Sequence, residues 1–509
     1  MELLTTNQSQ ALDRLSIEKF GVSSNKLMKN AGKAVTDESI SLLKKIKNPF
    51  VLVFVGNGNN GIDALITAKN LHDNGVNVKI MTTSVKKRDG IYLKFYQRCI
   101  DSNIEILSES KIHEIKTPNL IIDGILGTGF KKKVRKELIS VIEWVNKSKS
   151  IVLSIDVPSG LNTDSGLVGN IAVNANYTVT IDKLKVGMVF RHGKRQSGTI
   201  KIAKVGFPQK AKLLLGGLRW KMFNENLAFR LLKKPKIDIN KYNSGKVLII
   251  AGSKGMTGAS ILATHGALRS GAGMTISMVP SSLNNIFEKC ILEGMTYSLN
   301  DSESGYLEIE HFDEIMDKVS WADSVLIGPG LGRNKSTLKL IKKLIFTIKK
   351  PLILDADGLF PFKNSYKRLN ERKFPLVITP HFGELSSITG IETKIIESEF
   401  PEIMTSAMQS FNHTALVKQV PSCTFNKKNV TINNSGNPGL AKAGSGDVLS
   451  GIIASFIAQG MGIEESTKLA AFIHGKSSDI ISFKKGFRGQ NPSDLLDIIP
   501  RVIMNYENA

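Results

Sequence analysis

The sequence contains little cysteine and no long apolar run. Its 509 residues include three cysteines, Cys99, Cys290 and Cys423, which lie far apart along the chain. This spacing excludes a cysteine-based zinc site and suits a reducing compartment, so we expect a cytoplasmic protein. No stretch of about 18 uninterrupted apolar residues is present, which argues against a membrane-spanning helix. The first residues also lack the basic and apolar segments of a secretory signal.

Aromatic residues are scarce, at 7%, and acidic residues are outnumbered by basic ones, 45 against 68, which gives a net charge of +23. Such an excess of positive charge is compatible with nucleic-acid binding. However, the lysines are scattered through segments such as FKKKVRKE and are not interleaved with aromatics, as a single-strand binder requires. We therefore expect no nucleic acid as a main partner. The positive field would instead attract small anionic molecules.

Two series of buried strands and helices indicate two α/β domains. Short apolar runs such as PFVLVFVG and SIVLSIDVPSG alternate with helical stretches in the first half. This pattern is typical of a parallel sheet covered on both faces. A second series begins at GKVLIIAGSKG and closes with two long helical stretches, and the pattern loosens between the two series. We predict an N-terminal domain over residues 1–215, a connector over 216–235 and a C-terminal domain over 236–509.

Three strand ends in the first half carry polar side chains beside glycines. They are VGNGNNGIDAL (Val55–Leu65), IIDGILGTGF (Ile121–Phe130) and SIDVPSGLN (Ser154–Asn162). Ligands bind at the carboxyl ends of strands in open parallel sheets, and glycines let the backbone approach a phosphate. The carboxamides and carboxylate of the first loop suit an alkali ion or ribose hydroxyls. The same features also suit a simple tight turn or, at Asp156, a strand-end cap.

The ordered set LMKNAG, VGNGNNGIDAL, DGILGTGF, IDVPSGLNTDSG and VTIDKLKVG resembles the NAD(P)H-hydrate epimerase family, across nearly all of residues 10–210. The resemblance implies a Rossmann-like three-layer domain. It also implies that Asp156 is the acid/base and that Lys185 assists it. By the same resemblance, K+ would be held by Asn59, Asp123 and Ser159. The nucleotide part of the substrate would be bound by Asn57, Gly58, Asn59, Asn60 and Gly61, and by Gly127, Thr128, Gly129 and Phe130.

This first half departs from the family pattern at two positions of the glycine loop. Ile62 and Ala64 stand where the family has glycines. Larger side chains at these positions can narrow the pocket, which puts efficient epimerisation in doubt without affecting the fold.

The second half carries its main signal in NPGLAKAGSGDVLSGIIASF (Asn437–Phe456). Gly444 to Asp447 precede a long apolar helix, so their amides can form an anion hole for a phosphoryl group. Asp447 can accept a proton from an attacking hydroxyl, and we expect the helix dipole to lower its pKa. The same carboxylate could merely stabilise the helix N-terminus. Neither a Walker A loop nor a GxGxxG fingerprint is present.

The set GSKGMTGAS, GPGLG, LDADGL, TPHFGE and AGSGDVLSGII resembles the ADP/ATP-dependent NAD(P)H-hydrate dehydratases of the ribokinase-like superfamily, over about residues 235–505. The resemblance implies a ribokinase-like α/β domain that uses ADP or ATP with Mg2+ as co-substrate. Asp447 would act at the substrate hydroxyl. The hydrated dinucleotide would contact Ala259, Gly332, His381 and Asp447. The nucleotide would contact Lys418, Gln419, Val420, Pro421, Ser422 and Gly446.

Several alternatives remain open for individual residues of the second half. Asp355, Asp357 and Glu384 could hold Mg2+ through water or position a phosphate, but LDADGL could equally be a strand-end turn. His381 could be a hydrogen-bonded turn residue instead of a ligand. His474 lies on an apolar helix and is expected to be a core residue.

Together the two resemblances predict a bifunctional repair enzyme. Its substrates would be the hydrates of NADH and NADPH together with ADP or ATP, and we expect a homo-oligomer without a membrane partner. One alternative is a ribokinase-like small-molecule kinase with a non-catalytic N-terminal binding domain. Another is a scaffold or RNA-binding protein that has lost catalysis.

Overall fold

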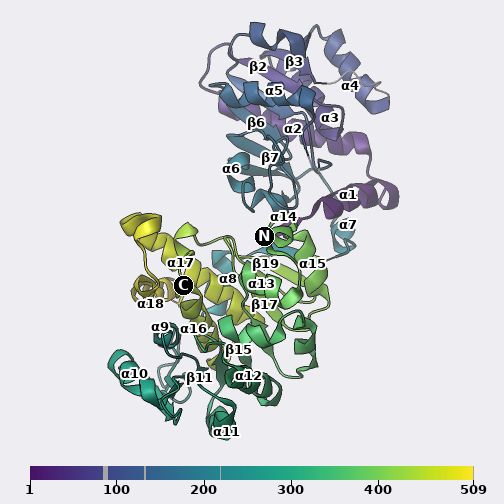
Figure 1. Ribbon diagram of the computed structural model, residues 1–509. Helices are drawn as coiled ribbons and strands as arrows, with labels where there is room; N and C mark the ends of the chain where they lie inside the picture. The colour runs from purple at the N-terminus through teal and green to yellow at the C-terminus, as the bar shows by residue number, and fades with distance from the viewer. Residues whose placement is uncertain (84–89, 131–132, 218, 508–509) are drawn as a thin grey trace. The chain divides into compact units, whose positions relative to one another are not determined.

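The computed structural model describes residues 1–83, 90–130, 133–217 and 219–507. By internal contacts the chain divides into two compact units, one of Glu2–Trp220 and one of Lys221–Ala509 together with Met1. The segment expected to be a connector contains strand β10 (Arg219–Met222) and helix α8 (Glu225–Leu231). Figure 1 shows both units as mixed helix and strand structures. Among the described residues, no helix is both long and apolar enough to cross a membrane.

The N-terminal unit is built on a seven-stranded sheet in the order β4-β3-β2-β5-β6-β7-β9. All its neighbouring strands are parallel. The chain moves outward from β2 to β4 and then returns to β5 on the other side of β2. This reversal places a crevice at the carboxyl ends of β2 and β5, where open α/β sheets bind ligands. The strands are β2 (Phe50–Val55), β3 (Asn77–Thr82), β4 (Glu105–Ser108), β5 (Leu120–Gly124), β6 (Ile151–Ile155), β7 (Tyr177–Ile181) and β9 (Thr199–Ala203).

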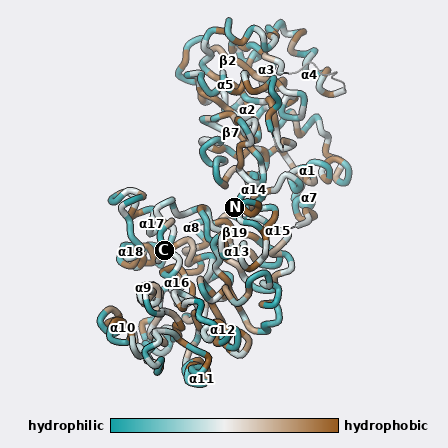
Figure 2. Tube along the Cα trace, viewed as in Figure 1, coloured by the Kyte–Doolittle hydropathy of each residue, from teal (hydrophilic) through white to brown (hydrophobic). Residues whose placement is uncertain are grey.

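Helices cover both faces of this sheet. On one face, Val51, Val53 and Val55 of β2 share a core with α2 (Ser24–Leu43), α3 (Asn59–Asp73) and α4 (Gly90–Asp101). On the other face, Leu52 and Phe54 share a core with α5 (Lys136–Lys147). Successive strand residues point to opposite faces, so an uninterrupted apolar strand requires exactly such a double cover. Figure 2 shows β2 as a hydrophobic segment inside this unit. The predicted Rossmann-like three-layer arrangement is confirmed.

A short parallel pair connects the beginning of the chain to the later part of this unit. Strand β1 (Glu2–Leu4) pairs with β8 (Leu184–Lys185), and α1 (Thr6–Arg14) follows β1 directly. The first turn of α1 is further fixed because the Thr6 amide donates to Asp164 Oδ1 over 2.7 Å. These contacts hold α1 beside the strand that carries Lys185.

The C-terminal unit has a second parallel sheet, in the order β13-β12-β11-β14-β15-β16-β17, which continues into antiparallel β18 and β19. The chain again reverses, between β11 and β14. The strands are β11 (Lys246–Ile250), β12 (Met274–Pro280), β13 (Met295–Leu299), β14 (Ser324–Ile327), β15 (Leu352–Leu354), β16 (Leu376–Ile378), β17 (Thr414–Val417), β18 (Cys423–Phe425) and β19 (Asn429–Ile432). The predicted second α/β fold is confirmed.

One face of this second sheet is covered by an apolar helix layer. Val247 and Ile249 of β11 share a core with α9 (Thr257–Leu268) and α16 (Ser445–Ala458). The same core includes α17 (Ile463–Gly489) and α18 (Pro492–Glu507). Nearly every residue of α16 from Val448 onward is buried, because this helix lies between the sheet and the outer helices. The start of α16 is thereby held firmly at the carboxyl edge of the sheet.

Candidate active sites

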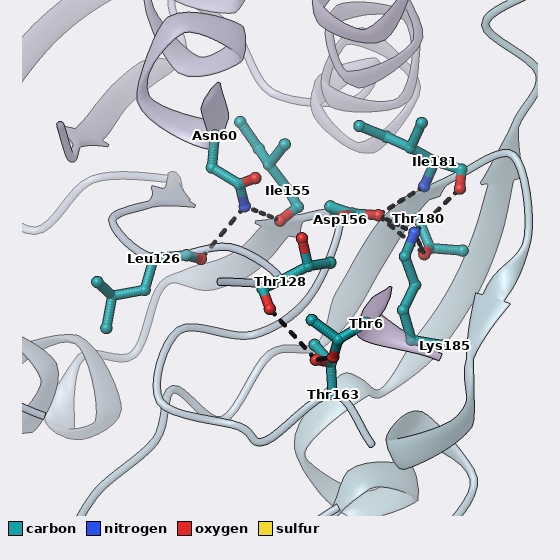
Figure 3. A network of polar contacts seen from close by, with 10 residues as sticks. All are labelled: Thr6, Asn60, Leu126, Thr128, Ile155, Asp156, Thr163, Thr180, Ile181 and Lys185. Atoms are coloured by element: carbon teal, nitrogen blue, oxygen red, sulfur yellow. Dashed lines mark hydrogen bonds and ion pairs between the residues drawn. The ribbon is translucent and has the colours of Figure 1, made fainter. Parts of the chain in front are cut away.

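A buried ion pair lies at the end of β6 in the N-terminal unit. Asp156 follows β6 directly and is 5% exposed, and its carboxylate pairs with the ammonium group of fully buried Lys185. The same carboxylate oxygen accepts hydrogen bonds from Thr180 Oγ1 over 3.2 Å and from the Ile181 amide over 2.9 Å (Figure 3). Asp156 has a φ of 63°, a conformation that costs a non-glycine residue energy. Strain and burial together favour a functional residue over a simple strand-end cap.

Two further carboxylates act electrostatically on this pair. Burial raises the pKa of Asp13, on α1, to about 6; Asp156 raises it further and Lys185 lowers it. Burial also raises the pKa of Asp63, on α3, well above its usual range, with Asp156 and Asp13 adding to the effect. The Asp63 Oδ1 atom is buried without a hydrogen-bond partner among the described residues. The carboxylates thus raise the pKa of Asp13 and Asp63, while Lys185 offsets the charge of only Asp156 and Asp13, so the cluster can retain a proton near neutral pH.

Asp123 forms a separate oxygen-rich centre at the end of β5. It is fully buried, and its carboxylate accepts hydrogen bonds from Ser154 Oγ over 2.8 Å and from the Ser159 amide over 2.9 Å. Ser159 Oγ lies 2.5 Å from Asp123 Oδ1 and 3.2 Å from the Leu126 carbonyl oxygen. Burial raises the pKa of Asp123 despite these hydrogen bonds. No lysine or arginine within the described ranges forms an ion pair with it.

This donor set consists of a carboxylate, a hydroxyl and a carbonyl, which are the ligands that a hard cation such as K+ prefers. A buried carboxylate without a basic partner also gains from a bound cation. The structure therefore brings Asp123 and Ser159 together in a way that fits the ion expected from the sequence. Asn59, the third expected ligand, is exposed at the start of α3.

The two glycine loops expected to bind the nucleotide part lie against each other. Asn60 Nδ2 donates to the Leu126 carbonyl over 3.2 Å and to the Ile155 carbonyl over 2.7 Å (Figure 3). The carboxamide of Asn60 also packs against Gly127, because a Cβ added at Gly127 would lie only 2.4 Å from Asn60 Oδ1. The side chain of Asn60 therefore joins three strand ends, and Asn57, Gly58 and Asn59 remain exposed beside it.

The second loop continues through Gly127, Thr128, Gly129 and Phe130. The Thr128 carbonyl accepts a hydrogen bond from Thr163 Oγ1 over 3.5 Å, and Thr163 Oγ1 lies 2.5 Å from Thr6 Oγ1 (Figure 3). Gly129 is exposed and its three neighbours in the loop are half-buried. The loop thus connects α1 to the edge of the crevice.

The two substituted glycine positions face the core instead of the crevice. Ile62 and Ala64 belong to the apolar cluster that α3 shares with α2 and with one face of the sheet. A Cβ at Gly124 would lie 2.5 Å from the Ala64 methyl group, so Ala64 packs directly on β5. Their added volume fills the helix–sheet interface and does not occupy the space above the strand ends.

The second site lies at the N-terminus of α16. Gly444 adopts the left-handed conformation, with φ 94°, and Asp447 follows in the first helical turn. The expectation that the helix dipole lowers the pKa of Asp447 is wrong. Burial raises this pKa to about 7, and the carboxylates of Asp355, Glu384 and Asp357 raise it further against the opposing effect of Lys418. The helix dipole is worth only about 0.3–1 kcal/mol.

Lys418, at the end of β17, connects the loop of α16 to the neighbouring strand ends. Its ammonium group lies 2.6 Å from Asp355 Oδ1 and 3.7 Å from Glu384 Oε2. A Cβ at Gly446 would lie 3.1 Å from the same Nζ atom. Burial lowers the pKa of Lys418, but Asp355 and Glu384 outweigh this effect and raise it. Lys418 therefore carries its charge at the point where an anion at the loop would lie.

The rest of the expected nucleotide segment forms the turn into β18. Val420 is exposed, and the Ser422 carbonyl accepts a hydrogen bond from the Asn433 amide over 2.9 Å. Gln419 and Pro421 are half-buried in the same turn. Only Lys418 of this segment is brought directly to Gly446 by the described contacts.

The two histidines singled out in the sequence have different environments. His381 caps α13 (Phe382–Thr389), because its Nδ1 accepts from the Gly383 amide over 3.0 Å, while its side chain stays 57% exposed. In the neutral ring Nε2 therefore carries the proton, and it lies 3.4 Å from Glu384 Oε1. His474 is buried, and burial lowers its pKa to about 4, as expected for a core histidine.

Ala259 and Gly332 lie near one cavity of about 520 Å³, which is lined by Met256, Tyr306, Gly332, Arg333, Asn334 and Asp357. A Cβ at neighbouring Gly330 would lie 2.9 Å from the Ala259 methyl group. Asp357 belongs both to this cavity and to the group of charges that raises the pKa of Asp447. Within the described ranges, no three His, Cys, Asp or Glu side chains are arranged to hold a metal ion, and this includes Asp355, Asp357 and Glu384.

Comparison with known proteins accounts for both halves. Residues 24–187 match the YjeF-related protein N-terminus family, and residues 247–501 match the NAD(P)H-hydrate dehydratase family. The bifunctional NAD(P)H-hydrate repair enzyme Nnr of Moorella thermoacetica is 32% identical, covering 100% of this chain and 97% of the relative. The enzyme of that name from Thermofilum pendens is 30% identical, covering 99% and 96%. The chain belongs to the family of bifunctional NAD(P)H-hydrate repair enzymes, which confirms the resemblance seen in its sequence.

Solved structures cover the C-terminal half. A ribokinase-like superfamily protein from Enterococcus faecalis is 23% identical with a TM-score of 0.49, covering 57% of this chain and 97% of its own. The ADP/ATP-dependent NAD(P)H-hydrate dehydratase of Bacillus subtilis, co-crystallised with ATP and Mg2+, is also 23% identical with a TM-score of 0.49, covering 56% and 99%.

Proposed function

We propose that the N-terminal unit interconverts the R and S forms of hydrated NADH and NADPH, and that the C-terminal unit dehydrates the S form with ADP or ATP. The observation that carries this proposal is that one chain has two separate acid/base centres. One is the Asp156–Lys185 pair at the end of β6, and the other is Asp447 at the N-terminus of α16, within the electrostatic reach of Lys418. The family membership extends over both units. We assign epimerisation to residues 1–215 and dehydration to residues 236–509.

Epimerisation requires reversible loss and return of the hydroxyl on the hydrated nicotinamide ring. Asp156 exchanges the proton with that hydroxyl, while Lys185 fixes the orientation of the carboxylate. Negative charge from Asp13, and from Asp156 once it has given its proton to the departing hydroxyl, stabilises the cationic ring that remains. The loops at Asn57–Gly61 and Gly127–Phe130 bind the nucleotide part of the substrate.

K+ fits the centre formed by Asp123 and Ser159, with Asn59 as the expected third ligand. When bound, K+ supplies positive charge that offsets the pyrophosphate and the buried carboxylate. Asp123 in turn orients Ser159 and the Leu126 segment, and so positions the second glycine loop.

Dehydration proceeds by phosphorylation of the substrate hydroxyl. Asp447 accepts the hydroxyl proton, and a pKa of about 7 lets it do so near neutral pH. Amides of Gly444–Gly446 and the ammonium of Lys418 stabilise the transferred phosphoryl group. The phosphoryl transfer leaves AMP from ADP, or ADP from ATP. Phosphate then departs with the C–O electron pair, and loss of a proton from the neighbouring ring carbon forms the C=C bond that restores the dihydronicotinamide. Mg2+ enters with the nucleotide as part of the co-substrate.

An assay on a mixture of R and S hydrates tests the proposal. The purified chain is incubated with the mixture, Mg2+ and either ADP or ATP, and the dihydronicotinamide absorbance is followed. We expect the absorbance to return with stoichiometric release of phosphate. A chain that binds nucleotide but leaves the hydrate unchanged would favour the alternative of a small-molecule kinase with a binding module.

A further inference from the structure

The cavity in the C-terminal unit contains an arginine that lies outside every residue set inferred from the sequence. Arg333 lines this cavity beside Gly332, and Tyr306 and Asp357 also line it. The cavity volume of about 520 Å³ is sufficient for a substantial part of a dinucleotide. Because Asp357 also acts on Asp447, the cavity lies next to the proposed chemistry of this unit.

Arg333 is held in place but keeps its terminal nitrogens available. Its Nε lies 3.0 Å from Asp357 Oδ1, and its guanidinium carbon lies 4.6 Å from the centre of the Phe360 ring. No hydrogen bond engages its terminal NH2 groups within the described residues, and the side chain is 63% exposed. A guanidinium fixed through Nε presents its other N–H groups in the planar geometry that suits phosphate oxygens.

The neighbouring loop keeps this arginine at the cavity. The Gly332 amide donates to Asp357 Oδ2 over 3.0 Å, so one carboxylate holds both the loop backbone and the arginine. Gly332 has a φ of 80°, and a Cβ there would lie 3.1 Å from the Tyr306 ring. A side chain at position 332 would therefore close the cavity between the ring and the guanidinium.

We propose that Arg333 binds a phosphate group of the hydrated dinucleotide and thereby sets the affinity of the C-terminal unit for its substrate. This proposal rests on the dehydratase function proposed above. Two sources of phosphate are possible: the pyrophosphate common to both hydrates, and the 2′-phosphate found only in the NADPH hydrate. Tyr306 also lines the cavity and can pack against a planar part of the same ligand.

Steady-state kinetics of Arg333→Ala and Arg333→Lys with the S hydrates of NADH and NADPH test the proposal. Loss of one charge-assisted contact predicts a KM increase of about 10- to 100-fold for Arg333→Ala, with kcat nearly unchanged. Arg333→Lys keeps the positive charge but loses the planar pair of N–H donors, so its KM should lie between those of the wild type and Arg333→Ala. An increase for both hydrates identifies the pyrophosphate, and an increase for the NADPH hydrate alone identifies the 2′-phosphate.

Arg368→Ala is the matched control, because Arg368 is also an exposed arginine in an ion pair, with Glu371. Unchanged KM values for both hydrates in Arg333→Ala would overturn the proposal. So would an increase in the KM of ADP alone, which would assign the cavity to the nucleotide. Titration of NADPH and NADH into the wild type and Arg333→Ala measures the same contact without turnover. If the wild type turns over neither hydrate, the proposed function fails, whereas equal product affinities in the two proteins refute the role of Arg333.

Discussion

Replacing Asp447 by asparagine removes the proposed proton acceptor while keeping its size. A pKa of about 7 means that the wild-type carboxylate is about half ionised at pH 7. Below this pH, the dehydration rate should fall about tenfold per pH unit, because only the ionised form accepts the proton. In Asp447→Asn this limb should vanish, and kcat at pH 7.5 should fall by about 10²- to 10⁴-fold.

The same substitution, which lowers activity, should not lower the stability of the folded protein at alkaline pH. The folded-state pKa of Asp447 lies above the unfolded value of 3.8, so the folded protein binds this proton more tightly. Its contribution to stability is present below pH 3.8 and is lost as pH rises to about 7. The loss is at most about 1.4 kcal/mol per pH unit in that window. Asp447→Asn lacks this titration, so at pH 8 it should be at least as stable as the wild type.

The assay combines initial rates on the S hydrate from pH 5.5 to 8.5 with denaturant unfolding of the C-terminal unit at pH 5 and pH 8. Asp497→Asn is the control, because Asp497 is an exposed carboxylate with 78% of its side chain accessible. Activity of Asp447→Asn within a few-fold of the wild type would refute the base assignment. An inactive variant that is also less stable at pH 8 would show that Asp447 has a mainly structural role.

Three further outcomes follow from the two units. Asp13→Asn should move the alkaline limit of epimerisation to lower pH. In the wild type, Asp13 is negatively charged above about pH 6 and helps the neighbouring carboxylates to keep their proton, and asparagine removes this charge. Initial rates on the R hydrate measure the limit. Replacing K+ by choline should slow epimerisation and spare dehydration, and Asp123→Asn should remove that K+ response. A fragment of residues 221–509 should dehydrate the S hydrate. A fragment that starts at residue 236 lacks the fully buried Phe223, and loss of such a side chain lowers the free energy of unfolding by about 3–5 kcal/mol. Calorimetry should therefore show that the shorter fragment melts at a lower temperature.

The parallel strands could be predicted from the sequence because burial on both faces produces continuous apolar runs. The runs now seen as β2, β6 and β11 were recognised for this reason. The hairpin of β18 and β19 was missed, since CTF and NVTI are short and mix polar with apolar residues. Helix α18 was missed because Pro500 and several charged residues interrupt its apolar pattern.

The candidate sites could be predicted only in part. Asp156 and Asp447 stand in local motifs, so their positions were visible in the sequence. Asp13 was not visible, because it approaches Asp156 only through the pairing of β1 with β8. The pKa of Asp447 was misjudged because both its burial and the approach of Asp355 and Glu384, which are distant in sequence, arise only in the folded unit. The helix dipole can be inferred from the local sequence, but its effect on the pKa is smaller than that of burial beside like charges.

The measurement that tests the central claim most directly is complete repair of a substrate enriched in the R hydrate, by wild type and by Asp156→Ala. The wild type, supplied with ADP or ATP and Mg2+, should recover all the dihydronicotinamide in a fast phase followed by a slow one. Asp156→Ala should stop once the S form is spent, apart from slow spontaneous epimerisation. Equal slow phases in the two proteins would contradict the role of Asp156. A wild-type enzyme that stalls after the fast phase would contradict the claim that one chain carries both activities.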